Sequence, residues 1–191
     1  MSLISFNETL AVLPVDGPAV SHNATNTEAL VPFNYTAVLP NGYLKIGRVI
    51  RCTMMGEITQ LLGAGNTIQF NLNLGAAGTV LIYTLTTLNV ISRTFGRVPF
   101  VLSGCFTVRL VGTGTSSQAY GIFTMTSPCL IGSPVSTQLG GNSSLLSPSG
   151  TPVASVGYDY SVLNILSMSG LPGNTPQAWV RVNQWVVESL N

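Results

Sequence analysis

The residues that could carry out acid–base chemistry are few in this chain and lie far apart. His22 is the single histidine. A serine–histidine–aspartate triad would have to recruit it, with Asp16 or Asp159 as the orienting acid. Nothing else in the sequence supports such a triad, so we expect His22 to be a solvated polar residue.

The three cysteines do not form a metal-binding pattern. A zinc site needs several cysteines or histidines at short spacing. Cys52, Cys105 and Cys129 are far apart and include no CxxC pair. Their odd number and their strand-like surroundings predict three small buried side chains in a reducing compartment, and no metal site.

The acidic residues are equally isolated. Paired carboxylates could hydrolyse a glycosidic bond, but Glu57 and Asp159 each stand alone among apolar neighbours. We expect Glu57 to pair with Arg51 or Arg109 across neighbouring strands. The glycine-rich segment 75–78 lacks the ending of a phosphate-binding loop. The sequence therefore predicts that the chain is not an enzyme and has no catalytic residues and no cofactor.

Charge is the most unusual feature of the composition. Only 7% of the 191 residues are charged, and the net charge is +1, whereas about 25% are charged in an ordinary soluble domain. Seven dispersed bases are too few to neutralise a nucleic acid backbone. No apolar run approaches the roughly 20 residues that span a membrane. Because soluble monomers rely on surface charge, we expect other protein copies to cover this surface.

Beyond residue 42, apolar and polar residues alternate with a period of two, which indicates β-strands. The clearest run is Thr67–Leu74. Runs that we also expect to be strands cover residues 30–39, 50–59, 80–88, 100–110, 119–125, 156–168 and 178–187. Glycine-rich turns separate them. The sequence predicts an all-β fold, an antiparallel jelly-roll-like β-sandwich of about eight strands with an extended N-terminal arm.

Two segments fall outside this alternation. Residues 1–42 contain four prolines and short apolar clusters, and they are expected to be either an arm that packs on a neighbour or the first strand and loops of the same domain. Residues 43–191 would form the sandwich. Within it, residues 127–154 are rich in serine, proline and glycine, and a loop of such length is usually functional or disordered.

Apolar residues in these segments are the candidate contacts with other proteins. In the arm they are Leu10, Val12, Leu13, Leu30, Val31 and Phe33. In the last predicted strand, Trp179 and Trp185 lie six residues apart, which places them on the same face. Together with Arg181 they are the candidate subunit interface, since tryptophan and arginine are enriched where interfaces are tightest.

An ordered series of motifs resembles a family of tailed-phage virion structural proteins. The series comprises Leu44–Arg51, Phe70–Gly75, the strand and turn Pro99–Gly114, Ala119–Phe123 and the closing Val187–Asn191. It covers about residues 43–191. This chain has Ser103 where the family's motif has an acid, so one inter-strand charge pair of the family is expected to be missing.

The resemblance implies a jelly-roll-like sandwich, commonly trimeric, mounted on the particle as a head decoration, head fibre or spike. It brings no catalytic residues. We therefore expect a homo-oligomer, with a trimer favoured, that binds virion proteins such as the major capsid protein through residues 1–42. Its location would be the virion, assembled in the host cytoplasm. The alternative is a tail-associated module that recognises a receptor or glycan through loop 127–154 and exposed aromatics such as Tyr158 and Tyr160.

Overall fold

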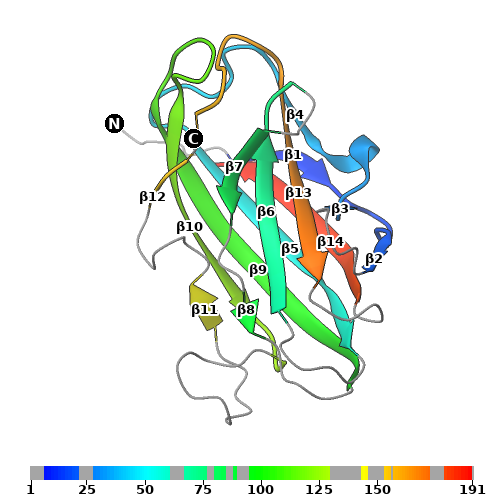
Figure 1. The fold of residues 1–191 in the computed structure, drawn as a ribbon. Coiled ribbons are helices and arrows are strands. Elements are labelled where there is room, and N and C mark those ends of the chain that lie inside the picture. The colour runs from blue at the N-terminus through cyan, green and yellow to red at the C-terminus, as the bar shows by residue number, and fades with distance from the viewer. Residues whose placement is uncertain are drawn as a thin grey trace.

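The computed structural model describes residues 7–21, 28–60, 67–76, 80–84, 88–89, 95–129, 143–145, 153–155, 157–172 and 179–190. Among these residues the chain forms β-strands and one short 3₁₀ helix, η1 (Phe33–Tyr35). The strands make two antiparallel sheets that stack face to face (Figure 1). The predicted all-β antiparallel sandwich is confirmed.

The larger sheet has eight strands in the order β1-β14-β5-β9-β10-β11, with β2 beside β14 and β12 beside β10. Its strands are β1 (Glu8–Val12), β2 (Ala19–Ser21), β5 (Val49–Gln60), β9 (Phe95–Leu110), β10 (Gln118–Thr126), β11 (Ser143–Leu145), β12 (Val153–Ala154) and β14 (Trp179–Ser189). The hairpin between β9 and β10 turns at Gly114, whose φ of 65° favours glycine.

The smaller sheet has six strands in the order β3-β13-β6-β7, with β4 beside β13 and β8 beside β6. Its strands are β3 (Glu28–Ala29), β4 (Ala37–Leu39), β6 (Thr67–Leu74), β7 (Val80–Thr84), β8 (Leu88–Asn89) and β13 (Asn164–Pro172). The last two strands, β13 and β14, enter different sheets and pair with β6 and β5. The C-terminal strands therefore pair with the first long strand of each sheet.

Two predicted strands are shorter than the alternation suggested. The run 156–168 becomes a strand only at Asn164, because that side chain bonds the preceding turn through the carbonyl oxygens of Asp159 and Val162 at 2.8 and 3.0 Å. The run 30–39 is interrupted by η1, so that only Ala37–Leu39 is a strand. In both places local turn hydrogen bonds replace the sheet ladder.

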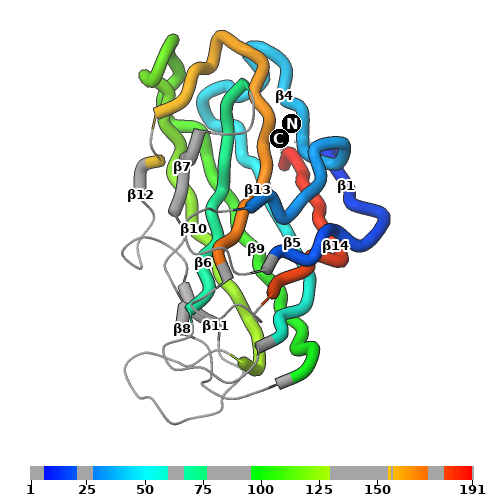
Figure 2. Tube along the Cα trace, turned by 45° about the vertical axis from the view of Figure 1, so that its right-hand side comes forward, coloured from blue at the N-terminus to red at the C-terminus, as the bar shows by residue number. Residues whose placement is uncertain are grey.

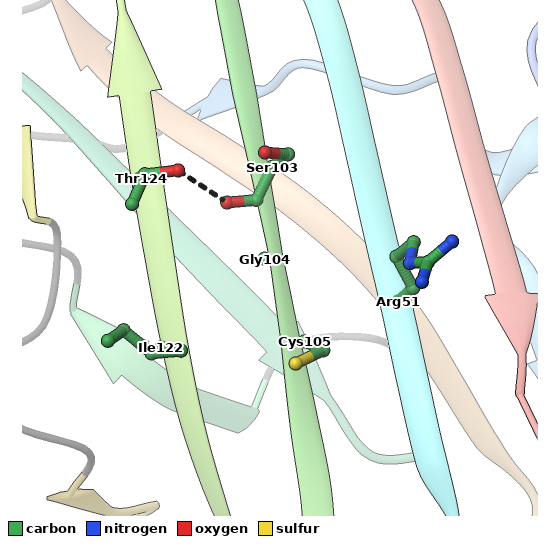
Figure 3. A pocket seen from close by; sticks show the side chains of 6 residues that line it. All are labelled: Arg51, Ser103, Gly104, Cys105, Ile122 and Thr124. Atoms are coloured by element: carbon green, nitrogen blue, oxygen red, sulfur yellow. Dashed lines mark hydrogen bonds between the residues drawn. The ribbon is translucent and has the colours of Figure 1, made fainter. Parts of the chain in front are cut away.

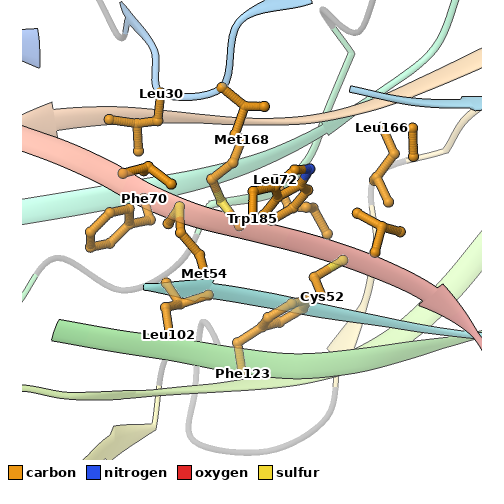
Figure 4. Close-up of a cluster of buried hydrophobic side chains, with 14 of the residues drawn as sticks. Leu30, Cys52, Met54, Phe70, Leu72, Leu102, Phe123, Leu166, Met168 and Trp185 are labelled. Atoms are coloured by element: carbon orange, nitrogen blue, oxygen red, sulfur yellow. The ribbon is translucent and has the colours of Figure 1, made fainter. Parts of the chain in front are cut away.

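The core lies between the two sheets and is built by the alternation itself. On β6, Ile68, Phe70, Leu72 and Leu74 are buried. They meet inward side chains of the larger sheet, and the Phe70 and Phe100 rings lie 5.5 Å apart. Figure 4 shows this packing for ten labelled side chains: Leu30, Cys52, Met54, Phe70, Leu72, Leu102, Phe123, Leu166, Met168 and Trp185.

The outward positions of β6 and β13 carry amides and hydroxyls that bond one another. Asn73 Nδ2 donates to Ser169 Oγ at 2.9 Å, and Gln69 Nε2 donates to Asn71 Oδ1 at 3.0 Å. Such pairs satisfy polar groups without any charge. At these positions the smaller sheet is therefore built from neutral polar side chains.

Candidate functional site

The N-terminal segment belongs to the sandwich along the part that the structure describes. β1 and β2 pair with β14, and β3 and β4 pair with β13. Of the two alternatives for residues 1–42, these strands correspond to the second, strands and loops of the same domain. The segment lies along the side of the sandwich where both sheets end (Figure 2).

The six apolar residues proposed as arm contacts divide into three groups by exposure. Leu13, Leu30 and Val31 are at most 2% exposed and pack in the core. Phe33 is 68% exposed and Val12 is 46% exposed. Leu10, the sixth, is partly buried against the core. The buried side chains of the first group therefore hold the segment in place, while the Val12 and Phe33 side chains are exposed to solvent.

Two further exposed valines come from the same segment. Val15 follows β1 and is 54% exposed, and Val38 on β4 is 52% exposed. We call Val12, Val15, Phe33 and Val38 the N-terminal edge. Alternation on β4 identifies Val38 as outward-facing, since Ala37 and Leu39 on either side of it are fully buried. Neither valine is among the predicted arm contacts, because nothing in the composition of the segment distinguishes them from its buried apolar residues.

Backbone hydrogen bonds and one side-chain hydrogen bond hold the N-terminal segment against the sheets. The Leu13 amide donates to the Trp185 carbonyl at 2.8 Å, and the Leu30 amide donates to the Met168 carbonyl at 3.0 Å. At the start of β1, the Tyr43 hydroxyl donates to Glu8 Oε2 at 2.6 Å. Burial and the Glu8 carboxylate together raise the pKa of Tyr43. These bonds hold the backbone that carries the exposed apolar side chains against both sheets.

The prediction that Trp179 and Trp185 share one face is wrong. The register between β14 and β5 shifts between Val182 and Gln184, and Asn183 and Gln184 are both exposed. This bulge moves the side chains beyond it to the opposite face. Trp185 is fully buried in the core and offers no surface to a second copy, whereas Trp179 lies on the outer face of the larger sheet.

Arg181 lies beside Trp179 in a small charged cluster. Its guanidinium carbon is 5.3 Å from the centre of the Trp179 ring. Arg181 Nη1 and Arg97 Nη1 each lie 3.7 Å from Glu57 Oε1. The partners expected for Glu57 are therefore corrected, because Arg51 instead pairs with Glu188 at 3.7 Å. Two arginines on one carboxylate stabilise the ends of three strands against one another.

Cysteine chemistry is limited by burial. Cys52, Cys105 and Cys129 are all free. Cys52 and Cys129 are at most 2% exposed, and burial raises the pKa of both thiols. Cys105 is partly exposed, which corrects the expectation that all three are buried. No group of three or more histidines, cysteines, aspartates or glutamates that could hold a metal occurs among the described residues.

Cys105 lines a depression of about 280 Å³ on the larger sheet. Figure 3 shows the lining residues, which come from β5, β9 and β10: Arg51, Ser103, Gly104, Cys105, Ile122 and Thr124. Thr124 Oγ1 donates to the Ser103 carbonyl at 3.4 Å. None of the six is a carboxylate or an imidazole, so the lining offers a guanidinium, a thiol and hydroxyl groups for contacts.

The features proposed for the alternative module lie elsewhere. Tyr158 is 1% exposed, which corrects its assignment as an exposed aromatic, and Tyr160 is half-buried. The Asp159 carboxylate accepts bonds from the Ser161 amide at 2.8 Å and the Ser161 hydroxyl at 2.6 Å. These bonds lower the pKa of Asp159 and mark a turn.

His22 and most of loop 127–154 lie outside the described residues. In the part of the chain that is described, no helix is long and apolar enough to cross a membrane.

No family model matches the chain, and no curated protein matches it in sequence. Lectin I from Ulex europaeus, solved with the methyl glycoside of α-L-fucose, is similar at 10% identity and a TM-score of 0.38, over 97% of this chain and 85% of the lectin. The CBM2 module of the evolved Dit of Lactobacillus casei BL23 phage J-1 is similar at 10% identity and a TM-score of 0.34, over 98% of this chain and 97% of the module. Alginate lyase A1-II′, of polysaccharide lyase family 7, is similar at 11% identity and a TM-score of 0.25, over 76% of this chain and 65% of the lyase. At TM-scores this low, nothing about ligand or activity follows for this chain.

Proposed function

We propose that this chain is a non-enzymatic structural protein of a phage virion. It would form an oligomeric decoration, fibre or spike that attaches to the particle through the N-terminal edge, with the major capsid protein among its partners. The observation that carries the proposal is the N-terminal edge itself: four exposed apolar side chains on a segment anchored by buried neighbours. The ordered motif series that resembles virion proteins supports a phage particle as the structure to which this surface attaches.

The chemistry of the edge suits lasting attachment. Burial of apolar surface contributes roughly 25 cal/mol per Å², and Phe33 at 68% exposure has most of its surface still to bury. Apolar side chains that lie singly on a surface are ordinary. Here they come from β1, the turn after it, η1 and β4, which lie along one side of the sandwich (Figure 1). A partner that covered this side would also cover β1, which ends the larger sheet among the described strands, and the edge strand of a sheet invites association.

The low charge of the chain supports the same role. With 7% charged residues and a net charge of +1, copies packed at high density would not repel one another. A virion protein works in that situation, because neighbours cover surfaces that a free monomer would need to keep charged. The same composition would make a free monomer poorly soluble.

The attachment test uses phage particles that lack this chain and are incubated with the purified protein. Sedimentation of the particles should carry wild-type protein with them. The Phe33→Ser and Val38→Ser variants should stay in the supernatant although they fold normally. Leu110→Ser is the matched control, since Leu110 is 49% exposed but lies at the end of β9. Equal attachment of all four proteins, or none with wild type, would overturn the proposal.

The alternative, a receptor- or glycan-binding module, has one observation in its favour. Trp179 presents an aromatic ring on the outer face beside the Arg181 guanidinium, and rings of this kind can stack on sugars. A glycan array probed with wild type and Trp179→Ala distinguishes the two functions. Specific binding that Trp179→Ala abolishes would favour the alternative, and attachment to particles without glycan binding favours the structural role.

A further inference from the structure

The outer face of the larger sheet is a second exposed surface, separate from the N-terminal edge. We call the outward side chains of β5, β9, β10 and β14 the large-sheet face. Met55 and Val101 are register partners near its middle, and each is 39% exposed. Tyr120 on β10 is 41% exposed. A sheet face open to water is normally polar, whereas this face also exposes the side chains of Met55, Val101 and Tyr120.

The four strands of the face carry four arginines and two glutamates, a net charge of +2: Arg51, Arg97, Arg109, Arg181, Glu57 and Glu188. Arg51 pairs with Glu188, and Glu57 pairs with both Arg97 and Arg181. Lys45, the single lysine of the sequence, precedes β5 and is not part of the face. Lysine is the usual guard against sheet association. The face therefore keeps a net positive charge, which is spread over several strands and screened at physiological ionic strength, so that a second copy would meet only weak repulsion.

The face also has relief. Figure 3 shows Ser103 and Cys105 on β9, where they line the depression. Val101 comes two residues before Ser103 on the same strand, and alternation places it on the same side. Gly104, which lies between Ser103 and Cys105, contributes only backbone to the lining, since a Cβ there would point toward the buried Phe123 ring. A volume of about 280 Å³ admits an apolar side chain the size of methionine or tyrosine. Met55 and Tyr120 on the same face could fill this depression in another copy.

The dimensions of the face match a protein interface. Ten residues along each of four strands, at about 3.3 Å per residue and about 4.8 Å between strands, cover roughly 600 Å² before side-chain relief. A stable interface buries about 800 Å² on each partner. The face is therefore of the right order to hold two copies together without help from the N-terminal edge.

We propose that the large-sheet face binds a second copy of this chain. The contact would pair Met55 and Val101 with apolar side chains of the other copy and seat one of them in the depression beside Cys105. This inference rests on the oligomeric part of the proposed function and names the surface responsible. It leaves the N-terminal edge free to attach the oligomer to the particle.

Cys105 supplies a built-in reporter for this contact. It lies in the depression and is partly exposed in the single chain, whereas Cys52 and Cys129 are buried. Alkylation of the native protein should therefore modify Cys105 alone, and oligomer formation should slow it by at least about tenfold, since a covered thiol is inaccessible. Light scattering at the same concentrations gives the mass relative to the 20.1 kDa chain.

The variants are Val101→Arg and Met55→Arg, with Val38→Arg on the N-terminal edge as the matched control. The first two should lower the mass to one chain and restore fast alkylation of Cys105, with circular dichroism unchanged. Val38→Arg should stay oligomeric and lose attachment to particles. If the arginine variants fail to fold, protection of Cys105 in the wild-type oligomer decides between support and rejection.

Two results would overturn the inference. One is an oligomer in which Cys105 is alkylated as fast as in a diluted single chain. The other is a wild-type protein of 20.1 kDa at every concentration. Neither result touches particle attachment, so the attachment assay with Val38→Arg still tests the proposed function separately.

Discussion

Phe100 lies directly opposite Gly56 across β5 and β9, and its ring fills the space that a side chain at Gly56 would need. A Cβ atom at Gly56 would lie 2.7 Å from Phe100 Cε1. Phe123 stands in the same relation to Gly104 on the next pair of strands. Rings that lie over a neighbouring glycine seal the inner face of the larger sheet against its own backbone.

Gly56→Ala should therefore destabilise the fold. The added methyl meets the Phe100 ring and the Arg181 carbonyl, and overpacking of this kind costs about 1–3 kcal/mol. Gly96→Ala is the control, because nothing lies within 4 Å of a Cβ at that position. Urea unfolding monitored by fluorescence gives both free energies of unfolding. A Gly56→Ala protein as stable as the Gly96→Ala protein would contradict the packing described.

The two tryptophans should differ sharply in their access to solvent. Because the bulge on β14 turns Trp185 inward and leaves Trp179 outward, Trp179→Phe should leave one shielded, blue-shifted emitter. Trp185→Phe should leave one emitter that acrylamide quenches several-fold more strongly. Stern–Volmer plots of the two variants measure this difference. Equal quenching constants would mean that both rings are equally accessible to solvent, which would contradict the bulge in β14.

The sequence predicted what depends on simple alternation. Thr67–Leu74 is a strand with its apolar side inward, as its pattern required. The faces of Trp179 and Trp185 could not be predicted, because one unpaired residue in β14 reverses the parity and leaves no mark in composition. The strand predicted over residues 30–39 is shorter, because η1 and its turn hydrogen bond take up the residues before Ala37–Leu39. The burial of Leu30 could not be predicted from the sequence either, since it depends on contact with β13, which is distant in the chain.

Alkaline pH should destabilise the protein in part through Tyr158. Burial raises the pKa of this hydroxyl above its ordinary value of 10.0, and the hydroxyl has no hydrogen-bond partner among the described residues. The folded state therefore holds the proton more tightly than the unfolded state, so stability is full below about pH 10 and falls as pH rises above it. Tyr158→Phe should lower the slope of stability against pH in this range and leave stability at pH 7 within about 1 kcal/mol of wild type. Urea unfolding at pH 7 and between pH 9.5 and 11 measures both effects, and an unchanged slope would mean that Tyr158 ionises freely in the native protein.

Leu30 and Phe33 test the division of the N-terminal segment into anchor and contact residues. Leu30 is fully buried, and its side chain occupies the space beside Gly170 on β13, where an added Cβ would lie 2.9 Å from Leu30 Cδ1. Leu30→Ala should therefore cost about 2–5 kcal/mol of unfolding free energy. Phe33 is 68% exposed, so Phe33→Ala should change that free energy by no more than about 0.5 kcal/mol. Attachment to particles should show the reverse order at a temperature where both variants are folded, with Phe33→Ala weakened and Leu30→Ala close to wild type. If Phe33→Ala attached like wild type, the exposed ring would be an ordinary surface residue, and the segment would serve the fold alone.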